Sequence, residues 1–75
     1  MTRQEFLVSK ISDCRKDPLA MAGHTSIHNG LVLSFRLGQI GDIRVTAAIY
    51  GQRLFDAPVV GIEEAIEAGF TIKEG

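Results

Sequence analysis

Arg36 and Arg44 are the residues of this 75-residue chain whose type and spacing point most directly to chemistry. Each lies in a segment of alternating apolar and polar residues, which is typical of half-buried antiparallel strands. If Leu37 pairs with Ile43, the two arginines face each other on one face of a sheet. Like charges in that position cost a few tenths to about 1 kcal/mol, so a compensating negative charge is expected.

Two sources of that negative charge remain open. An anionic partner would supply it, either a nucleic-acid backbone or a carboxylate-rich protein surface. Tyr50 and Arg53 would then extend the binding patch. Alternatively, Asp42, Glu74 or a glutamate of the C-terminal helical segment neutralises the arginines within the chain.

A second candidate surface is apolar. The same strand pairing sets Val32 opposite Ala48 on the face that carries the arginines. Phe6 lies about 100° around its helix from Leu7, off the apolar stripe. Phe6, Val32 and Ala48 are therefore candidates for an interface, although single exposed apolar side chains are common on any protein surface.

Metal binding finds little support in the sequence. His24 and His28 are four residues apart, and Cys14 or Asp17 would be needed to complete a ligand set. Structural zinc usually has four ligands in close Cys or His pairs, and this chain offers no second pair. We therefore expect no metal and no cofactor.

Catalytic and phosphate-binding patterns are also weak. Cys14 continues the apolar stripe of the first helix, so we expect it to pack as a small hydrophobic residue. No serine lies in a G-x-S-x-G turn. The spacing of Gly38 and Gly41 is too short for a phosphate-binding loop and lacks the following Lys-Ser/Thr, so a hairpin loop is the better interpretation.

The N-terminal segment reads as a helix. Thr2 and Glu5 match the capping box, in which both side chains satisfy free backbone N–H groups. An apolar stripe follows along the helix, and the helix should end before Pro18. One extra turn is expected after Asp17, and Gly23 suits a position beyond it.

The middle of the chain reads as strands. Residues 31–37 and 43–50 form the best-defined hairpin, and Asn29-Gly30 is a typical type I′ turn that would pair 25–28 with the first of them. A turn at Gly51-Gln52 would lead to a short third strand over 53–55, which Pro58 follows.

The C-terminal part reads as a helix between Gly61 and Gly69, followed by a short closing strand over 70–73. The whole pattern predicts a small single α+β domain over residues 1–75. In this domain an N-terminal helix, an antiparallel meander of three to four strands and a second short helix pack in two layers.

Composition limits the classes of function. The chain is 45% hydrophobic and 23% charged with a formal net charge of −1, so it lacks the overall basic charge of nucleic-acid-binding proteins. The charge is nevertheless uneven, near +2 over residues 1–37 and −3 over 38–75. One cysteine, no long apolar run and no signal-peptide pattern favour a cytoplasmic protein without membrane contact.

The sequence alone therefore favours a non-enzymatic protein–protein interaction module, since so short a chain has little room for both a core and a catalytic cavity. Such a module would be a small inhibitor, adaptor or assembly factor of the kind that phage or other mobile-element genes encode, and a homodimer would add stability. The alternative is a small protein that binds nucleic acid or another anion through Arg36 and Arg44.

Overall fold

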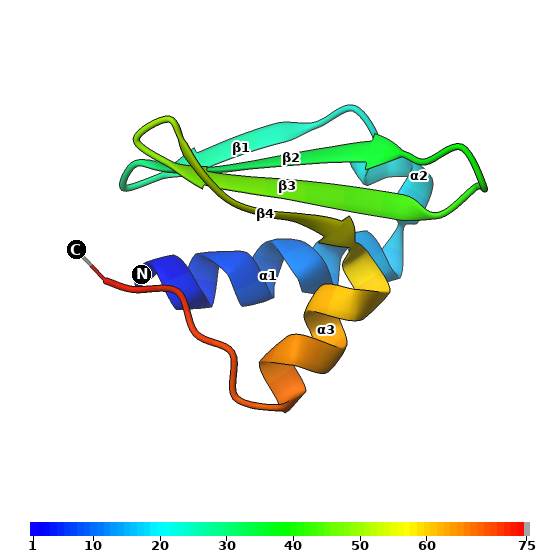
Figure 1. Cartoon of the computed structure of the whole chain (residues 1–75). Coiled ribbons are helices and arrows are strands. Elements are labelled where there is room, and N and C mark those ends of the chain that lie inside the picture. The colour runs from blue at the N-terminus through cyan, green and yellow to red at the C-terminus, as the bar shows by residue number, and fades with distance from the viewer. Residues whose placement is uncertain (75) are drawn as a thin grey trace.

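The structure, a computed structural model, describes residues 1–74. Its elements in chain order are α1 (Arg3–Lys16), α2 (Pro18–Met21), β1 (Thr25–His28), β2 (Leu31–Leu37), β3 (Ile43–Ile49), β4 (Gln52–Pro58) and α3 (Val59–Glu67). The four strands form one antiparallel sheet in the order β1-β2-β3-β4, and α1 and α3 lie together on one of its faces (Figure 1). The predicted α+β fold is confirmed.

The first helix begins and ends as its sequence predicts. The Thr2 hydroxyl accepts a hydrogen bond from the Glu5 backbone N–H at 3.0 Å, and the Glu5 carboxylate accepts one from the Thr2 N–H at 2.8 Å. These two bonds complete the capping box. The extra turn forms as α2, where the Asp17 side chain accepts from the Ala20 N–H.

The register of the central hairpin is the predicted one, and it agrees with the alternation of both strands. Leu37 pairs with Ile43 and Arg36 pairs with Arg44. Every second residue of β2 and β3 therefore points toward the helices, and the others point away from them. The β1–β2 hairpin also forms, with Asn29 and Gly30 at φ values of 49° and 80°, as a type I′ turn demands.

The core lies between the inner face of the sheet and the two longer helices. Its fully buried side chains come from α1, β2 and β3, with α3 closing one end, and they include Leu7, Leu31, Leu33, Phe35 and Val45. Within residues 1–74, no helix is long and apolar enough to cross a membrane.

Three predicted boundaries were wrong. The third strand runs from Gln52 to Pro58 rather than over 53–55, because Pro58 ends an edge strand, where the missing N–H breaks no ladder. The turn before β4 is centred on Tyr50 and Gly51, whose φ values are both positive. The last helix begins at Val59 directly after Pro58, so Gly61 lies inside it.

Residues 70–73 do not form the predicted closing strand. The segment belongs to no helix or strand and is held at the first residues of α1, mainly through the Gln4 side chain. Gln4 donates to the Phe70 C=O at 3.2 Å and accepts from the Ile72 N–H at 2.7 Å. The Glu74 carboxylate accepts from the backbone N–H groups of Arg3 and Gln4, the first residues of α1.

Arg3 joins this tail to the sheet. Its side chain donates from Nε to the Asn29 C=O at 2.8 Å and from Nη1 to the Lys73 C=O at 3.2 Å. Only 4% of the residue is exposed, and its guanidinium lies 5.6 Å from the centroid of the Tyr50 ring. One charged side chain therefore holds together the start of α1, the β1–β2 turn and the C-terminal tail.

Candidate functional site

The candidate site is the outer face of the sheet, which α1 and α3 leave uncovered (Figure 1). The strand pairing arranges its side chains in three cross-strand rows. One row is apolar and ends in an arginine, comprising Ile27, Val32, Ala48 and Arg53. The middle row carries hydroxyl groups and a carboxylate, from Thr25, Ser34, Thr46 and Asp56, and the third row holds Arg36 and Arg44.

Asp56 supplies the main counter-charge for the arginine pair. Arg36 Nη2 donates to both carboxylate oxygens of Asp56, at 2.8 and 2.9 Å, and Arg36 Nη1 donates to the Thr46 hydroxyl at 2.8 Å. Arg44 approaches the same carboxylate at 3.4 Å and the Asp42 carboxylate at 3.7 Å. Two carboxylates thus balance two guanidinium groups.

This network corrects part of the sequence interpretation. Asp42 was one of the carboxylates expected to neutralise the arginines, but Glu74 lies at the N-terminus of α1 instead. Asp56 was not considered, since the third strand was expected to end at Phe55. It faces Thr46 because β4 continues to Pro58 and carries a bulge. A prediction that extended the third strand to Pro58 would have placed Asp56 on it, within reach of the arginines.

The electrostatics of the network follow from its hydrogen bonds. The bond from Arg36 is the main reason that the pKa of Asp56 lies below its usual value, and the positive charges of Arg36 and Arg44 lower it further, against a smaller opposing effect of burial. Asp56 therefore stays ionised to a lower pH than an isolated aspartate does. The guanidinium groups, in turn, are largely committed to partners inside the chain.

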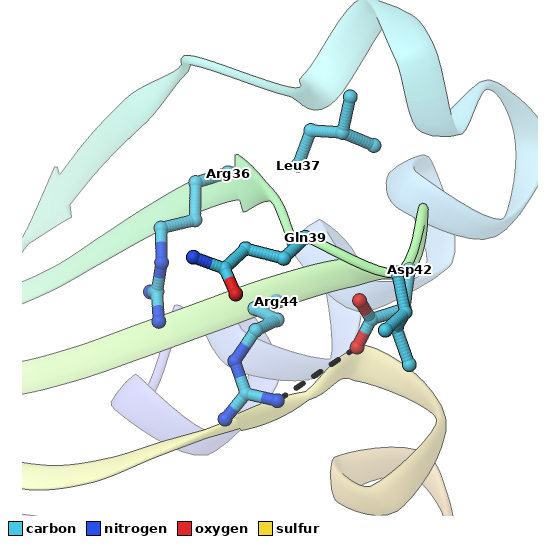
Figure 2. A pocket seen from close by; sticks show the side chains of 7 residues that line it. Arg36, Leu37, Gln39, Asp42 and Arg44 are labelled. Carbon is cyan, nitrogen blue, oxygen red and sulfur yellow. Dashed lines mark ion pairs between the residues drawn. The ribbon is translucent and has the colours of Figure 1, made fainter.

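Beside the network lies an open depression of about 450 Å³, lined by Arg36, Arg44 and the β2–β3 loop. Figure 2 shows the Gln39 amide between the two guanidinium groups, with Asp42 paired to Arg44 on the far side and Leu37 directed away. The loop keeps its shape through bonds from the Gly38 N–H to the Asp42 C=O and from the Gly41 N–H to the Gly38 C=O. The depression has both donors and acceptors on its walls.

The apolar row contains two residues that the sequence predicts and one that it missed. Val32 and Ala48 are direct cross-strand partners and both are half-buried. Ile27 of β1 is the cross-strand partner of Val32 on the side of β2 away from β3, and it is 69% exposed. The Asn29-Gly30 turn was the signal for it, because the register of that hairpin decides which face Ile27 occupies.

Tyr50 and Arg53 do not join the arginine pair. Arg53 lies opposite Ala48, four residues along β3 from Arg44, which corresponds to about 13 Å at the rise of a strand. Tyr50 lies at the far end of β3, where its exposed ring lies over Gly30. The outer face therefore separates an arginine end from an apolar end.

Phe6 is not part of any exposed surface. It is 7% exposed and packs in the core, with its ring centroid 5.2 Å from that of His28. Helix α1 is thus buried over a wider arc than the stripe of Leu7, Ile11 and Cys14 predicts. The reason is that β1 extends the sheet over Phe6 and covers it with His28.

The remaining candidates for chemistry occupy structural positions. Cys14 is 2% exposed, and burial is the main reason that its pKa is raised. His28 bonds through Nε2 to the Met1 C=O at 2.7 Å, whereas His24 is exposed. Over residues 1–74, no group of three or more His, Cys, Asp or Glu side chains is placed to hold a metal ion.

Comparison with known proteins adds nothing to these observations. No protein-family model, curated protein or solved structure matches the chain.

Proposed function

We propose that this protein is a non-enzymatic interaction module whose outer sheet face binds another protein. The observation that carries the proposal is the apolar row of Ile27, Val32 and Ala48 on a sheet face without helical cover. Contiguous apolar side chains bordered by polar groups are typical of protein interfaces. Here the polar border is the hydroxyl row and, beyond it, the arginine network.

The state of the arginines supports a protein partner over a nucleic acid. Arg36 and Arg44 already pair with Asp56 and Asp42, so the outer face has little net positive charge at that end. Such networks orient a protein partner through complementary hydrogen bonds, but they release few counterions from a phosphate backbone. In this proposal the module acts in the cytoplasm as a small inhibitor, adaptor or assembly factor, consistent with a phage or mobile-element origin.

A matched pair of variants tests the proposal. Val32→Lys places a charge in the centre of the apolar row, and Val60→Lys makes the same change on an exposed position of α3. Both tagged variants and the wild type are used to capture proteins from source-cell lysate, with quantitative mass spectrometry as the readout and circular dichroism as the folding check.

We expect at least one protein that the wild type and Val60→Lys capture equally and that Val32→Lys loses. The interaction should then be reconstituted from the two purified proteins. If every captured protein binds the folded Val32→Lys variant as well as the wild type, the outer face is not the binding surface.

The alternative proposal is binding of nucleic acid or another anion at the arginine end. The observation that favours it is the depression in which the Gln39 amide stands beside Arg36 and Arg44 (Figure 2). Gel shifts at low salt with the wild type and an Arg36→Ala/Arg44→Ala variant test it. Absence of a shift with the wild type would end this alternative.

A further inference from the structure

We propose that β1 pairs edge to edge with β1 of a second copy of this chain, about a two-fold axis centred on Ser26, and so joins the two sheets into one. This inference concerns the edge of the sheet rather than its outer face, and it goes beyond the interaction proposed above. It rests on which backbone groups of β1 have no partner among residues 1–74 and on how the two sheet edges differ.

The hydrogen-bonding pattern shows which residues of β1 face outward. The Phe35 N–H donates to the His24 C=O at 2.9 Å, so residue 24 bonds toward β2. Bonding and non-bonding positions alternate along an antiparallel strand, and Ser26 and His28 therefore also bond toward β2. The backbone N–H and C=O groups of Thr25 and Ile27 point away from the sheet.

The β2–β3 ladder agrees with this assignment. The Tyr50 N–H donates to the Gly30 C=O at 3.0 Å, so the even-numbered residues of β2 bond to β3. Its odd-numbered residues, Leu31 and Leu33, must then bond to their β1 partners His28 and Ser26. The β1–β2 and β2–β3 hydrogen bonds therefore agree that the backbone groups of Thr25 and Ile27 point away from β2.

The two edges of the sheet are not equally open. Natural edge strands are usually protected by proline, charged residues or bulges. Strand β4 has Pro58, Arg53 and the irregularity opposite Ala47 and Ala48. Strand β1 has no proline, Lys, Arg, Asp or Glu and is protected only by its length of four residues, and its most exposed apolar side chain is Ile27.

A second copy of β1 complements this edge without rearrangement. With Ser26 facing its own counterpart, Thr25 of each copy lies opposite Ile27 of the other. Every outward N–H then meets an outward C=O, because the outward residues form the hydrogen-bonded pairs of the new ladder. The exposed Ile27 side chain packs against Thr25 of the second copy on the outer face.

The short edge makes this a weak association. Four residues of strand bury less area than a stable interface requires, so we expect a dissociation constant on the order of 100 µM. Sedimentation velocity should show a concentration-dependent dimer of the wild type between about 20 and 500 µM. Thr25→Pro should remain monomeric, since it removes an outward N–H and leaves the β1–β2 ladder intact.

Disulfide trapping tests the register. Ser26→Cys faces its own counterpart at a non-hydrogen-bonded position, where Cα atoms lie about 4.5 Å apart, within reach of a disulfide. Thr25→Cys is the matched control, because its counterpart lies about 8 Å away, two residues along and one strand across. The native Cys14 is buried, so the wild type should not cross-link.

We expect Ser26→Cys to form a reducible dimer under mild oxidation at least about tenfold faster than Thr25→Cys. Equal rates for the two variants, or a wild type that stays monomeric at 500 µM, would overturn the proposal. The outcome is separable from that of the outer-face interaction, since Val32→Lys leaves the backbone of β1 untouched. Loss of partner capture by that variant together with Ser26→Cys cross-linking would support both proposals independently.

Discussion

Arg3→Ala should be among the most damaging substitutions in this protein, although arginine is rarely a core residue. The variant loses two hydrogen bonds from a charged donor, to the C=O groups of Asn29 and Lys73. Each such bond contributes about 1.5–3 kcal/mol, and water that enters the vacated space recovers part of the loss. We therefore expect the free energy of unfolding to fall by about 3 kcal/mol.

That loss is large for so small a domain. A chain of 75 residues has a free energy of unfolding of about 4–11 kcal/mol at the usual value per residue. Urea unfolding followed by circular dichroism measures the change directly, and the slope with urea checks that unfolding stays two-state. Hydrogen exchange at the Ile72 amide, which bonds to the Gln4 side chain, should accelerate as the tail loosens.

Two further variants sharpen the test. Arg3→Lys keeps the charge, but one ammonium cannot replace the separate Nε and Nη1 donors, so it should restore only part of the stability. Arg53→Ala removes an exposed arginine and should change stability by no more than about 0.5 kcal/mol. The reasoning is refuted if Arg3→Ala costs no more than Arg53→Ala with an unchanged urea slope.

Two other predictions concern a turn and an ion pair. Gly30→Ala should cost about 1 kcal/mol more than Gly23→Ala in urea unfolding, because both positions have positive φ but only at Gly30 would the new Cβ meet an aromatic ring, at 2.5 Å. Equal costs would mean that the ring moves aside freely. The hydrogen bond from Arg36 lowers the pKa of Asp56 in the folded state. The stability that ionised Asp56 contributes is therefore fully present above its unfolded-state pKa of about 3.9, and it is lost as pH falls through its folded-state pKa. Asp56→Asn should therefore lose less stability than the wild type as pH falls below about 4. Urea midpoints measured from pH 2 to 7 test this, and a decrease as steep as that of the wild type would contradict it.

The sequence by itself determined the first helix, the two hairpins over residues 25–49 and the pairing of their strands. Alternation has a period of two, so a slip of one residue would turn a whole strand's apolar side chains to solvent. The pairing of Leu37 with Ile43 satisfies this requirement and closes the strands with a five-residue loop. The capping box of Thr2 and the type I′ turn at Asn29-Gly30 are equally local, because each needs only a few adjacent residues. The position of Arg36 opposite Arg44 follows from the register alone.

Only the tertiary structure decided what surrounds those elements. Asp56 reaches the arginines because β4 is longer than its local pattern indicates and bulges beside β3. Phe6 is buried because a strand far along the chain covers it, and Arg3 is buried because a turn and the tail converge on it. Such contacts depend on how elements meet in space, and neither periodicity nor capping patterns encode that. The site's arginines and the partial counter-charge of Asp42 could be read from the sequence, whereas the role of Asp56 and the place of Ile27 on an open sheet edge required the fold.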